Sequence, residues 1–166
     1  TTGTIGSTGN IASGGNIDLT AQAMSLGNLT SSGSVTATAS AGNASFGTVD
    51  AANAITISAT GTPTLANAIS GGDTNITGAS ITLNNGTIGG DLALNATAGN
   101  LAGNGTVTVG NNIDLDATGT IGFGSLSAQS GAVTATAGGN LAGNSLAAAS
   151  GITIASGGDI VLANMN

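Results

Sequence analysis

The sequence predicts an all-β protein, a parallel β-helix (β-solenoid) of about eight coils with a period of 19–20 residues. Three observations lead to this prediction. Residues 91–110 contain three short apolar patches separated by Gly and Asn, a pattern typical of three strands joined by turns. Each patch recurs in step along the chain, and a Gly or Asn stands at one fixed place in every coil. We therefore expect 91–110 to form one coil that the rest of the chain repeats.

The first patch of each coil predicts a short strand with two inward side chains, because apolar and polar residues alternate in it. In the coil at 91–110 these inward residues are Leu92 and Leu94, and the spacing is looser around Ile76. The expected inward residues are Ile17/Leu19, Val35/Ala37, Ile55/Ile57, Ile76, Leu92/Leu94, Ile113/Leu115, Val133/Ala135 and Ile152/Ile154.

The middle and third patches each predict one apolar ladder that runs through the stack. The middle ladder is expected to contain Leu26, Phe46, Leu65, Leu83, Leu101, Ile121, Leu141 and Ile160. The third is expected to contain Leu29, Val49, Ile69, Ile88, Val107, Leu126 and Leu146. With three patches per coil, the cross-section should be triangular or oval.

A Gly or Asn stands two positions before each residue of the third ladder. These residues are Gly27, Gly47, Asn67, Gly86, Gly105, Gly124 and Asn144. Because Gly and Asn take positive φ most easily, the pattern predicts one left-handed corner in each coil.

The ends and one internal coil depart from the repeat. Residues 1–16 predict a partial first coil through Ile5 and Ile11, and the coil at 73–90 is two residues short, with Gly78 where other coils have Leu or Ala. The register after residue 154 stays open, because the ladder places Ile160 on the middle patch whereas the similarity of 154–162 to 11–19 places it on the first. We expect residues 1–166 to form a single β-helix segment that is part of a longer repeat array.

The composition excludes several classes of function. The chain has 166 residues, no Lys, Arg, His or Cys, and seven acidic residues, for a net charge of −7. It should therefore bind neither nucleic-acid phosphates nor an anionic membrane. No apolar run approaches the roughly 20 residues of a membrane-spanning helix. Low charge and small residues are also typical of disordered segments, but disorder does not require the apolar period.

The period, the xIxLxA strands, the GN-rich corners, and segments such as GGNIDLTAQ (14–22) and GNNIDLDATG (110–119) resemble the central shaft of filamentous-haemagglutinin-like exoproteins. The resemblance covers essentially the whole chain and is one of repeat style. It implies a right-handed parallel β-helix, bacterial export by the two-partner route, and a role as an extended shaft. The Asn-Pro motifs of that family's secretion domain are missing, so the resemblance is to the shaft alone.

Asp114 and Asp116 are the one carboxylate pair with a spacing suited to chemistry. They flank inward Leu115, so both should point outward, about 7 Å apart. Paired carboxylates can hydrolyse glycosidic bonds, but the chain has no basic group to place beside a substrate. We therefore expect a solvated strand face, a protein that is not an enzyme, and no catalytic, cofactor-binding or metal-binding residues.

Three features suggest binding alternatives. Gly-Gly-Asp triplets at 71–73, 89–91 and 157–159 partly match calcium-binding nonapeptide repeats but lack their regular Gly-x-Asp spacing. Outward Thr-x-Thr pairs at 36–38 and 134–136 make an ice-binding face a remote alternative, although Asp interrupts the array. Asn-x-Ser/Thr sequons are about as frequent as chance predicts; they begin at Asn28, Asn43, Asn75, Asn85, Asn95 and Asn104.

The function expected from these features is mechanical. The chain is predicted to be a structural shaft of an extracellular bacterial adhesin or fibre, without cofactors. Its expected partners are flanking repeats of the same fold or other copies of itself end to end, while a host or neighbouring cell would be contacted by parts outside this segment. The alternative is a self-assembling subunit of a homopolymeric extracellular filament or sheath.

Overall fold

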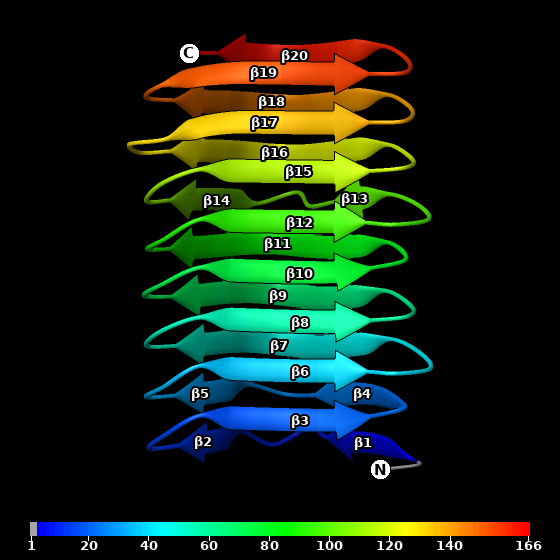
Figure 1. Ribbon diagram of the computed structural model, residues 1–166, viewed down its shortest axis with the longest axis vertical. Coiled ribbons are helices and arrows are strands. Elements are labelled where there is room, and N and C mark those ends of the chain that lie inside the picture. Colours follow the sequence, from blue (N-terminus) through cyan, green and yellow to red (C-terminus); the bar gives the residue numbers. More distant parts are fainter. Residues whose placement is uncertain (1–2) are drawn as a thin grey trace.

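The computed structural model describes residues 3–166, and all regular secondary structure in this range is β-strand. The strands form two parallel sheets, and each turn of the chain contributes to both (Figure 1). The predicted all-β solenoid is therefore confirmed.

The sheet in front in Figure 1 has eight strands, most of them five residues long, and each corresponds to one first patch. They are β3 (Ile17–Ala21), β6 (Val35–Ala39), β8 (Ile55–Ala59), β10 (Thr74–Gly78), β12 (Leu92–Ala96), β15 (Ile113–Ala117), β17 (Ala132–Ala137) and β19 (Gly151–Ser156).

The sheet behind has twelve strands in nine layers, because three layers are divided into two short strands. The divided layers are β1 (Thr4–Ser7) with β2 (Ile11–Ser13), β4 (Ala23–Leu26) with β5 (Leu29–Ser31), and β13 (Leu101–Ala102) with β14 (Thr106–Val109). The continuous layers are β7 (Ala44–Ala51), β9 (Pro63–Ser70), β11 (Ile81–Ile88), β16 (Ile121–Ala128), β18 (Leu141–Ala148) and β20 (Ile160–Met165).

The coils wind in a right-handed sense. In Figure 1 the chain climbs from the N-terminus to the C-terminus, running left to right along the eight-stranded sheet in front and right to left along the twelve-stranded sheet behind. Connections between neighbouring parallel strands of one sheet are right-handed in nearly all proteins. Eight layers on one sheet and nine on the other make eight complete coils and one further layer, close to the predicted eight.

Each coil has two faces rather than three. The middle and third patches lie in the same layer of the twelve-stranded sheet, and in β7, β9, β11, β16 and β18 they form one continuous strand of 8 residues. The section is therefore flattened, which corrects the triangular alternative. Gly and Asn between two patches do not require a turn when the backbone remains extended.

The predicted left-handed corners are wrong. No described residue, Gly or otherwise, has positive φ. Gly47, Asn67, Gly86, Gly124 and Asn144 lie inside strands, whereas Gly27 and Gly105 join the halves of divided layers. At Gly124 the need for Gly comes from space, because a Cβ would collide with the carbonyl oxygens of Asn104 and Gly105 in the preceding coil.

The first-patch ladder is confirmed in full. Two inward columns cross the eight-stranded sheet in register: Ile17, Val35, Ile55, Thr74, Leu92, Ile113, Val133 and Ile152, and Leu19, Ala37, Ile57, Ile76, Leu94, Leu115, Ala135 and Ile154. Ile76 thus belongs to the second column.

The middle ladder is corrected, because it combines two neighbouring columns. Leu26, Phe46, Leu65 and Leu83 form one column. Leu101, Ile121, Leu141 and Ile160 form the other, in which the partner of Leu101 in the preceding coil is Ile81 rather than Leu83. Both columns face inward, two residues apart, so apolar spacing alone does not distinguish them.

Two residues of the third ladder are also corrected. Val49 pairs with Ala68, and Ala68 with Gly86, so Ile69 points away from the core and is only half-buried. Ile88 pairs with Val109 in the next inward column. The open register at the end of the chain is settled in favour of the middle patch, since Ile160 pairs with Leu141.

The short coil at 73–90 places a polar residue inside. Thr74 is fully buried, and its hydroxyl lies 2.8 Å from the hydroxyl of Ser70, which also donates to the Gly72 carbonyl at 2.9 Å. Gly78 takes an inward position that is Ala96 in the next coil, and a Cβ at Gly78 would overlap the ring of Pro63. The absence of a side chain at Gly78 therefore leaves room for the Pro63 ring.

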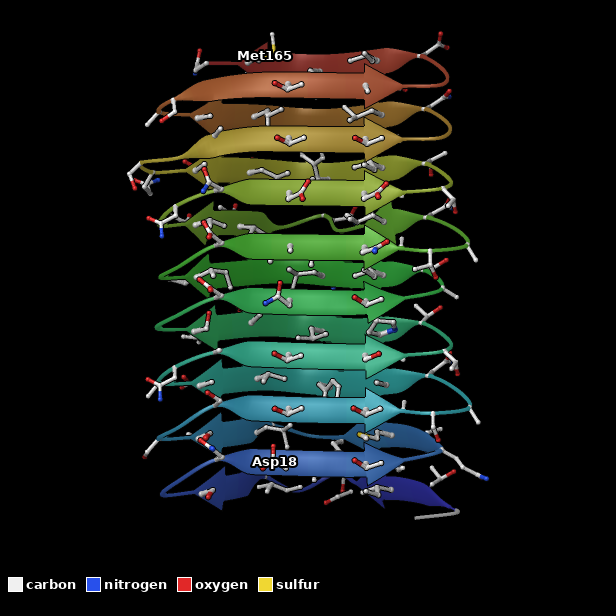
Figure 2. All side chains as sticks on the ribbon, viewed as in Figure 1. Asp18 and Met165 are labelled. Atoms are coloured by element: carbon white, nitrogen blue, oxygen red, sulfur yellow. The ribbon has the colours of Figure 1, made fainter. Side chains whose placement is uncertain are left out.

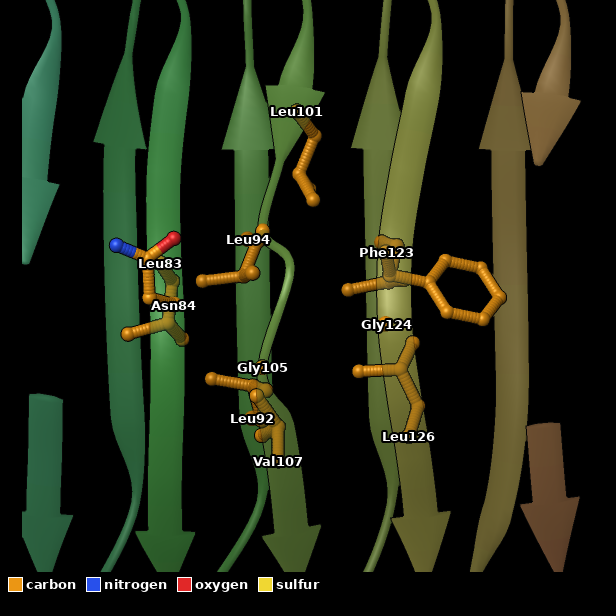
Figure 3. A pocket seen from close by; sticks show the side chains of 12 residues that line it. Leu83, Asn84, Leu92, Leu94, Leu101, Gly105, Val107, Phe123, Gly124 and Leu126 are labelled. Carbon is orange, nitrogen blue, oxygen red and sulfur yellow. The ribbon is translucent and has the colours of Figure 1, made fainter. Parts of the chain in front are cut away.

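The interior is narrow and apolar, and it contains one small irregularity. Where β13 and β14 are separated, Gly103 and Gly105 supply no side chain, and a cavity of about 10 Å³ remains among Leu83, Leu94 and Leu101 (Figure 3). The Phe123 ring points instead toward the next coil, where a Cβ at Gly143 would overlap it (Figure 3).

Candidate functional surfaces

The outer face of the eight-stranded sheet displays two straight columns of side chains; Figure 2 labels the first of them, Asp18. One column is Asp18, Thr36, Thr56, Asn75, Ala93, Asp114, Thr134 and Thr153; the other is Thr20, Thr38, Ser58, Thr77, Asn95, Asp116, Thr136 and Ala155. The columns contain the outward Thr-x-Thr pairs at 36–38 and 134–136 and the outward Asp114 and Asp116 that the sequence predicted. Carboxylates, amides and Ala interrupt the hydroxyl array that an ice-matching face would need.

Asp114 and Asp116 both lie on β15 and are exposed, on either side of buried Leu115. Their neighbours in the adjacent strands are Ala93, Asn95 and two Thr, none of which is charged. Within residues 3–166, no group of three or more His, Cys, Asp or Glu side chains is placed to hold a metal ion. Both carboxylates are exposed on the outer face of the sheet.

The three Gly-Gly-Asp triplets do not form one stacked array. Asp73 and Asp91 lie at the same corner in successive coils, and Asp73 Oδ1 accepts the backbone N–H of Asp91 at 2.9 Å. Asp91 Oδ1 in turn accepts hydrogen bonds from the backbone and side-chain nitrogens of Asn112, at 2.9 and 3.1 Å. Asp159 lies at the opposite corner, where its N–H donates to Asn140 Oδ1 at 3.0 Å.

These contacts belong to a pattern that we call the corner clamp: an Asn or Asp Oδ1 accepts the backbone N–H of a residue at the same corner of the next coil. Corner clamps at the two edges of the stack join Asn16 to Ser34, Asn43 to Thr62, Asp73 to Asp91, Asp91 to Asn112, Asn100 to Thr120, Asn112 to Ala132 and Asn140 to Asp159. The clamps satisfy backbone donors at the points where the chain enters a strand.

The sequence pattern showed the recurrent Asn residues but did not predict that they accept backbone hydrogen bonds from the next coil. The signal that could have revealed it is the recurrence of Asn or Asp directly before the apolar residue that opens a strand, as at Asn16, Asn100, Asn112 and Asn140. Three of the sequon residues, Asn28, Asn43 and Asn85, also accept a backbone N–H from the next coil, at 2.8, 2.8 and 3.2 Å.

A shallow groove of about 470 Å³ crosses the outer face of the twelve-stranded sheet near its C-terminal end. Small outward residues of four successive layers, Ala102, Gly122, Ala142 and Val161, line it, with Asn104 at its side. The sequence carries no signal for this groove, since small residues on an outer face have no periodicity of their own.

The last coil is the most exposed apolar part of the described chain. Ile160, Val161 and Met165 are 51%, 63% and 60% exposed. Ile160 and Met165 continue inward columns, through pairing with Leu141 and Leu146, so their exposure results from the absence of a further coil above them.

None of the described residues is helical, and thus no described helix is long and apolar enough to cross a membrane. Comparison of the chain with protein-family models, with curated proteins and with solved structures gave no match.

Proposed function

We propose that this chain is a structural shaft of an extracellular bacterial adhesin or fibre, similar in kind to the filamentous-haemagglutinin-like exoproteins whose repeat style it shares. The observation that carries the proposal is the unbroken register. Each layer pairs in parallel with the next across 18 to 21 residues of sequence, and both inward columns of the first patch run through all eight layers. Such a stack gains length and stiffness by repetition.

The proposed mechanism is mechanical. At about 4.8 Å per layer the nine layers span about 40 Å, and the coils are joined by backbone hydrogen bonds, apolar ladders and corner clamps. The net charge of −7, with no basic residue, keeps neighbouring shafts mutually repulsive and disfavours binding to nucleic acid or to anionic membranes. Contacts with a host or a neighbouring cell would come from parts of a longer protein outside this segment.

The second candidate is a subunit of a homopolymeric filament or sheath, which the same parallel, in-register stacking of coils supports.

Immunogold electron microscopy of the native material, with antibodies raised against the 166-residue chain, tests both candidates. Label on thin fibres outside the cell, at one site per fibre, would support the shaft. Label that recurs at a short, regular interval along each fibre would support the polymer. Label confined to the cell interior would refute both.

A further inference from the structure

The tripeptide Asn-Gly-Thr occurs twice in the chain, at 85–87 and at 104–106. Asn followed by Gly is the dipeptide that most readily loses its side-chain amide, because Gly has no Cβ to shield its backbone nitrogen from the Asn side chain. The two copies have the same residues at and after the reacting position, so a difference in their reactivity must come from the fold.

The first copy is held within a continuous strand. Gly86 of β11 pairs with Ala68 in the preceding coil and with Val107 in the next. The Asn85 side chain is also bonded, since its Oδ1 accepts the Thr106 N–H at 3.2 Å and its Nδ2 donates to a carbonyl of the preceding coil at 3.5 Å. Both the backbone and the side chain of this copy are therefore fixed.

The second copy lies in a β-bulge between β13 and β14, where the chain leaves the straight path of its neighbours (Figures 1 and 3). Between the paired positions on either side, residues 103–106 lie opposite residues 83–85 of the preceding coil. In the same way, residues 103–105 lie opposite residues 123–124 of the next coil. The bulge thus contains one residue more than each neighbouring layer, and this extra residue interrupts the ladder.

The peptide group that joins Asn104 to Gly105 has no hydrogen bond at either end. Among residues 3–166, no group accepts the Gly105 N–H or donates to the Asn104 carbonyl, and the exposed Asn104 side chain also has no partner. The bonds that anchor the bulge lie on either side, where the Gly103 N–H donates to the Gly122 carbonyl and the Ser125 N–H donates to the Gly105 carbonyl, both at 2.9 Å. The peptide group between them can rotate without breaking a hydrogen bond.

We propose that Asn104 is a site of spontaneous deamidation in the folded protein. The Gly105 nitrogen attacks Cγ of Asn104 and forms an N–Cγ bond, the Cγ–Nδ2 bond breaks, and the amide nitrogen leaves as ammonia with the proton of the Gly105 N–H. Closing this five-membered succinimide ring requires the Asn104 backbone to rotate away from the extended conformation, which the unbonded peptide group permits. Water then opens the ring at either of its two carbonyls, leaving aspartate or isoaspartate at this position.

Either product changes the outer face of the twelve-stranded sheet. Each adds one negative charge to the net charge of −7, at the side of the groove that Asn104 lines. Isoaspartate also lengthens the main chain by the Cβ atom, at a point where the bulge already interrupts the ladder, so β13 and β14 can keep their partners. The reaction depends only on this bulge and not on the proposed function.

Peptide mapping after incubation in mildly alkaline buffer tests the proposal, with one sample folded and one unfolded in guanidinium chloride. Endoproteinase Asp-N, which cuts before Asp, releases the two copies in separate peptides, 73–90 and 91–113. Mass spectrometry with fragmentation then measures the conversion of amide to acid at each Asn. Because the protease cuts before aspartate but not before isoaspartate, the acid form that stays uncut gives the share of isoaspartate.

The unfolded sample should convert Asn85 and Asn104 at similar rates, since their neighbours match. In the folded sample Asn104 should convert at least about tenfold faster than Asn85, because Asn85 must first break its hydrogen bonds and leave its strand. Both aspartate and isoaspartate should appear in the 91–113 peptide.

Matched variants assign the change to this residue. Asn104→Gln should abolish the acidic species that isoelectric focusing resolves in the folded sample, because Gln would have to close a six-membered ring, which is far slower. The control Asn95→Gln, at an exposed position on the outer face of the other sheet, should leave the conversion of Asn104 unchanged.

Three outcomes would overturn the proposal. Equal rates at Asn85 and Asn104 in the folded sample, or a faster rate at Asn85, would show that the bulge does not set the reactivity. Conversion of Asn104 in the unfolded sample alone would show that the bulge protects it as a strand does. Aspartate without isoaspartate would show direct hydrolysis of the side-chain amide, without attack by the Gly105 nitrogen.

Discussion

Two glycines in one strand separate the effect of space from the effect of backbone freedom. Gly122 and Gly124 both lie in β16. A Cβ at Gly122 would meet nothing within 4 Å, whereas one at Gly124 would collide with two carbonyl oxygens of the preceding coil. Neither residue has positive φ, so Ala can adopt the backbone conformation at both positions.

The Gly122→Ala and Gly124→Ala variants should differ in their free energy of unfolding by the cost of overpacking at Gly124. Replacing Gly by Ala stabilises a compatible site by about 0.4–1 kcal/mol through the unfolded chain, and this gain is common to both variants. The collision at Gly124 adds a cost of about 1–3 kcal/mol. The melting temperatures should then differ by about 2–12 °C, with Gly122→Ala at or above the parent protein.

Thermal unfolding followed by circular dichroism measures this difference directly, with the parent protein and both variants at one concentration. Amide exchange in β13 and β14 should show the added opening in Gly124→Ala, because those strands flank the crowded carbonyl groups. Equal melting temperatures for the two variants, or a higher one for Gly124→Ala, would refute the close-approach explanation.

Burial and contacts give three further predictions. Leu101→Asp should unfold the chain or lower its melting temperature severely, since Leu101 is buried. Thr56→Asp, at an exposed position between Thr36 and Asn75, should change the stability by less than about 0.5 kcal/mol, and equal shifts would contradict the inward and outward assignment. Ser70→Ala should lower the free energy of unfolding by about 1–3 kcal/mol, because it leaves the buried Thr74 hydroxyl unpaired. Thr74→Val should be nearly neutral, because Ser70 still donates to the Gly72 carbonyl. Denaturant unfolding measures both, and the reverse order would exclude this network. Gly105→Asn should melt no higher than Gly105→Ala, because both add the Cβ that collides with Asn84 and Asn85; a clear advantage for Asn would restore the left-handed corner.

The sequence was sufficient to predict the fold class and the eight-stranded sheet. Each first patch is a short alternating segment bounded by Gly, Asn or Ser, so its inward positions are fixed by period two, and even the degenerate coil keeps Ile76 in register. The outward positions of Asp114 and Asp116 followed from the same alternation.

The twelve-stranded sheet was harder to predict for two physical reasons. It has neighbouring inward columns that are both apolar, so a ladder built from the nearest Leu or Ile slips by two residues, as it does between Leu83 and Leu101. Gly has two uses, positive φ and the absence of Cβ, and Gly124 is used for the second. Composition does not distinguish these uses.

The uniform spacing between paired residues has a consequence for folding kinetics. Partners in adjacent layers are 18 to 21 residues apart from one end of the chain to the other. In a chain of 166 residues this separation corresponds to a relative contact order of about 0.11, a value found among fast-folding helical bundles rather than β-sandwiches. Every strand therefore finds its pairing partner within about one coil of sequence. Once one pair of coils has formed, adding the next coil closes a loop of similar length and therefore of similar entropy cost. Folding can then proceed coil by coil toward either end of the chain.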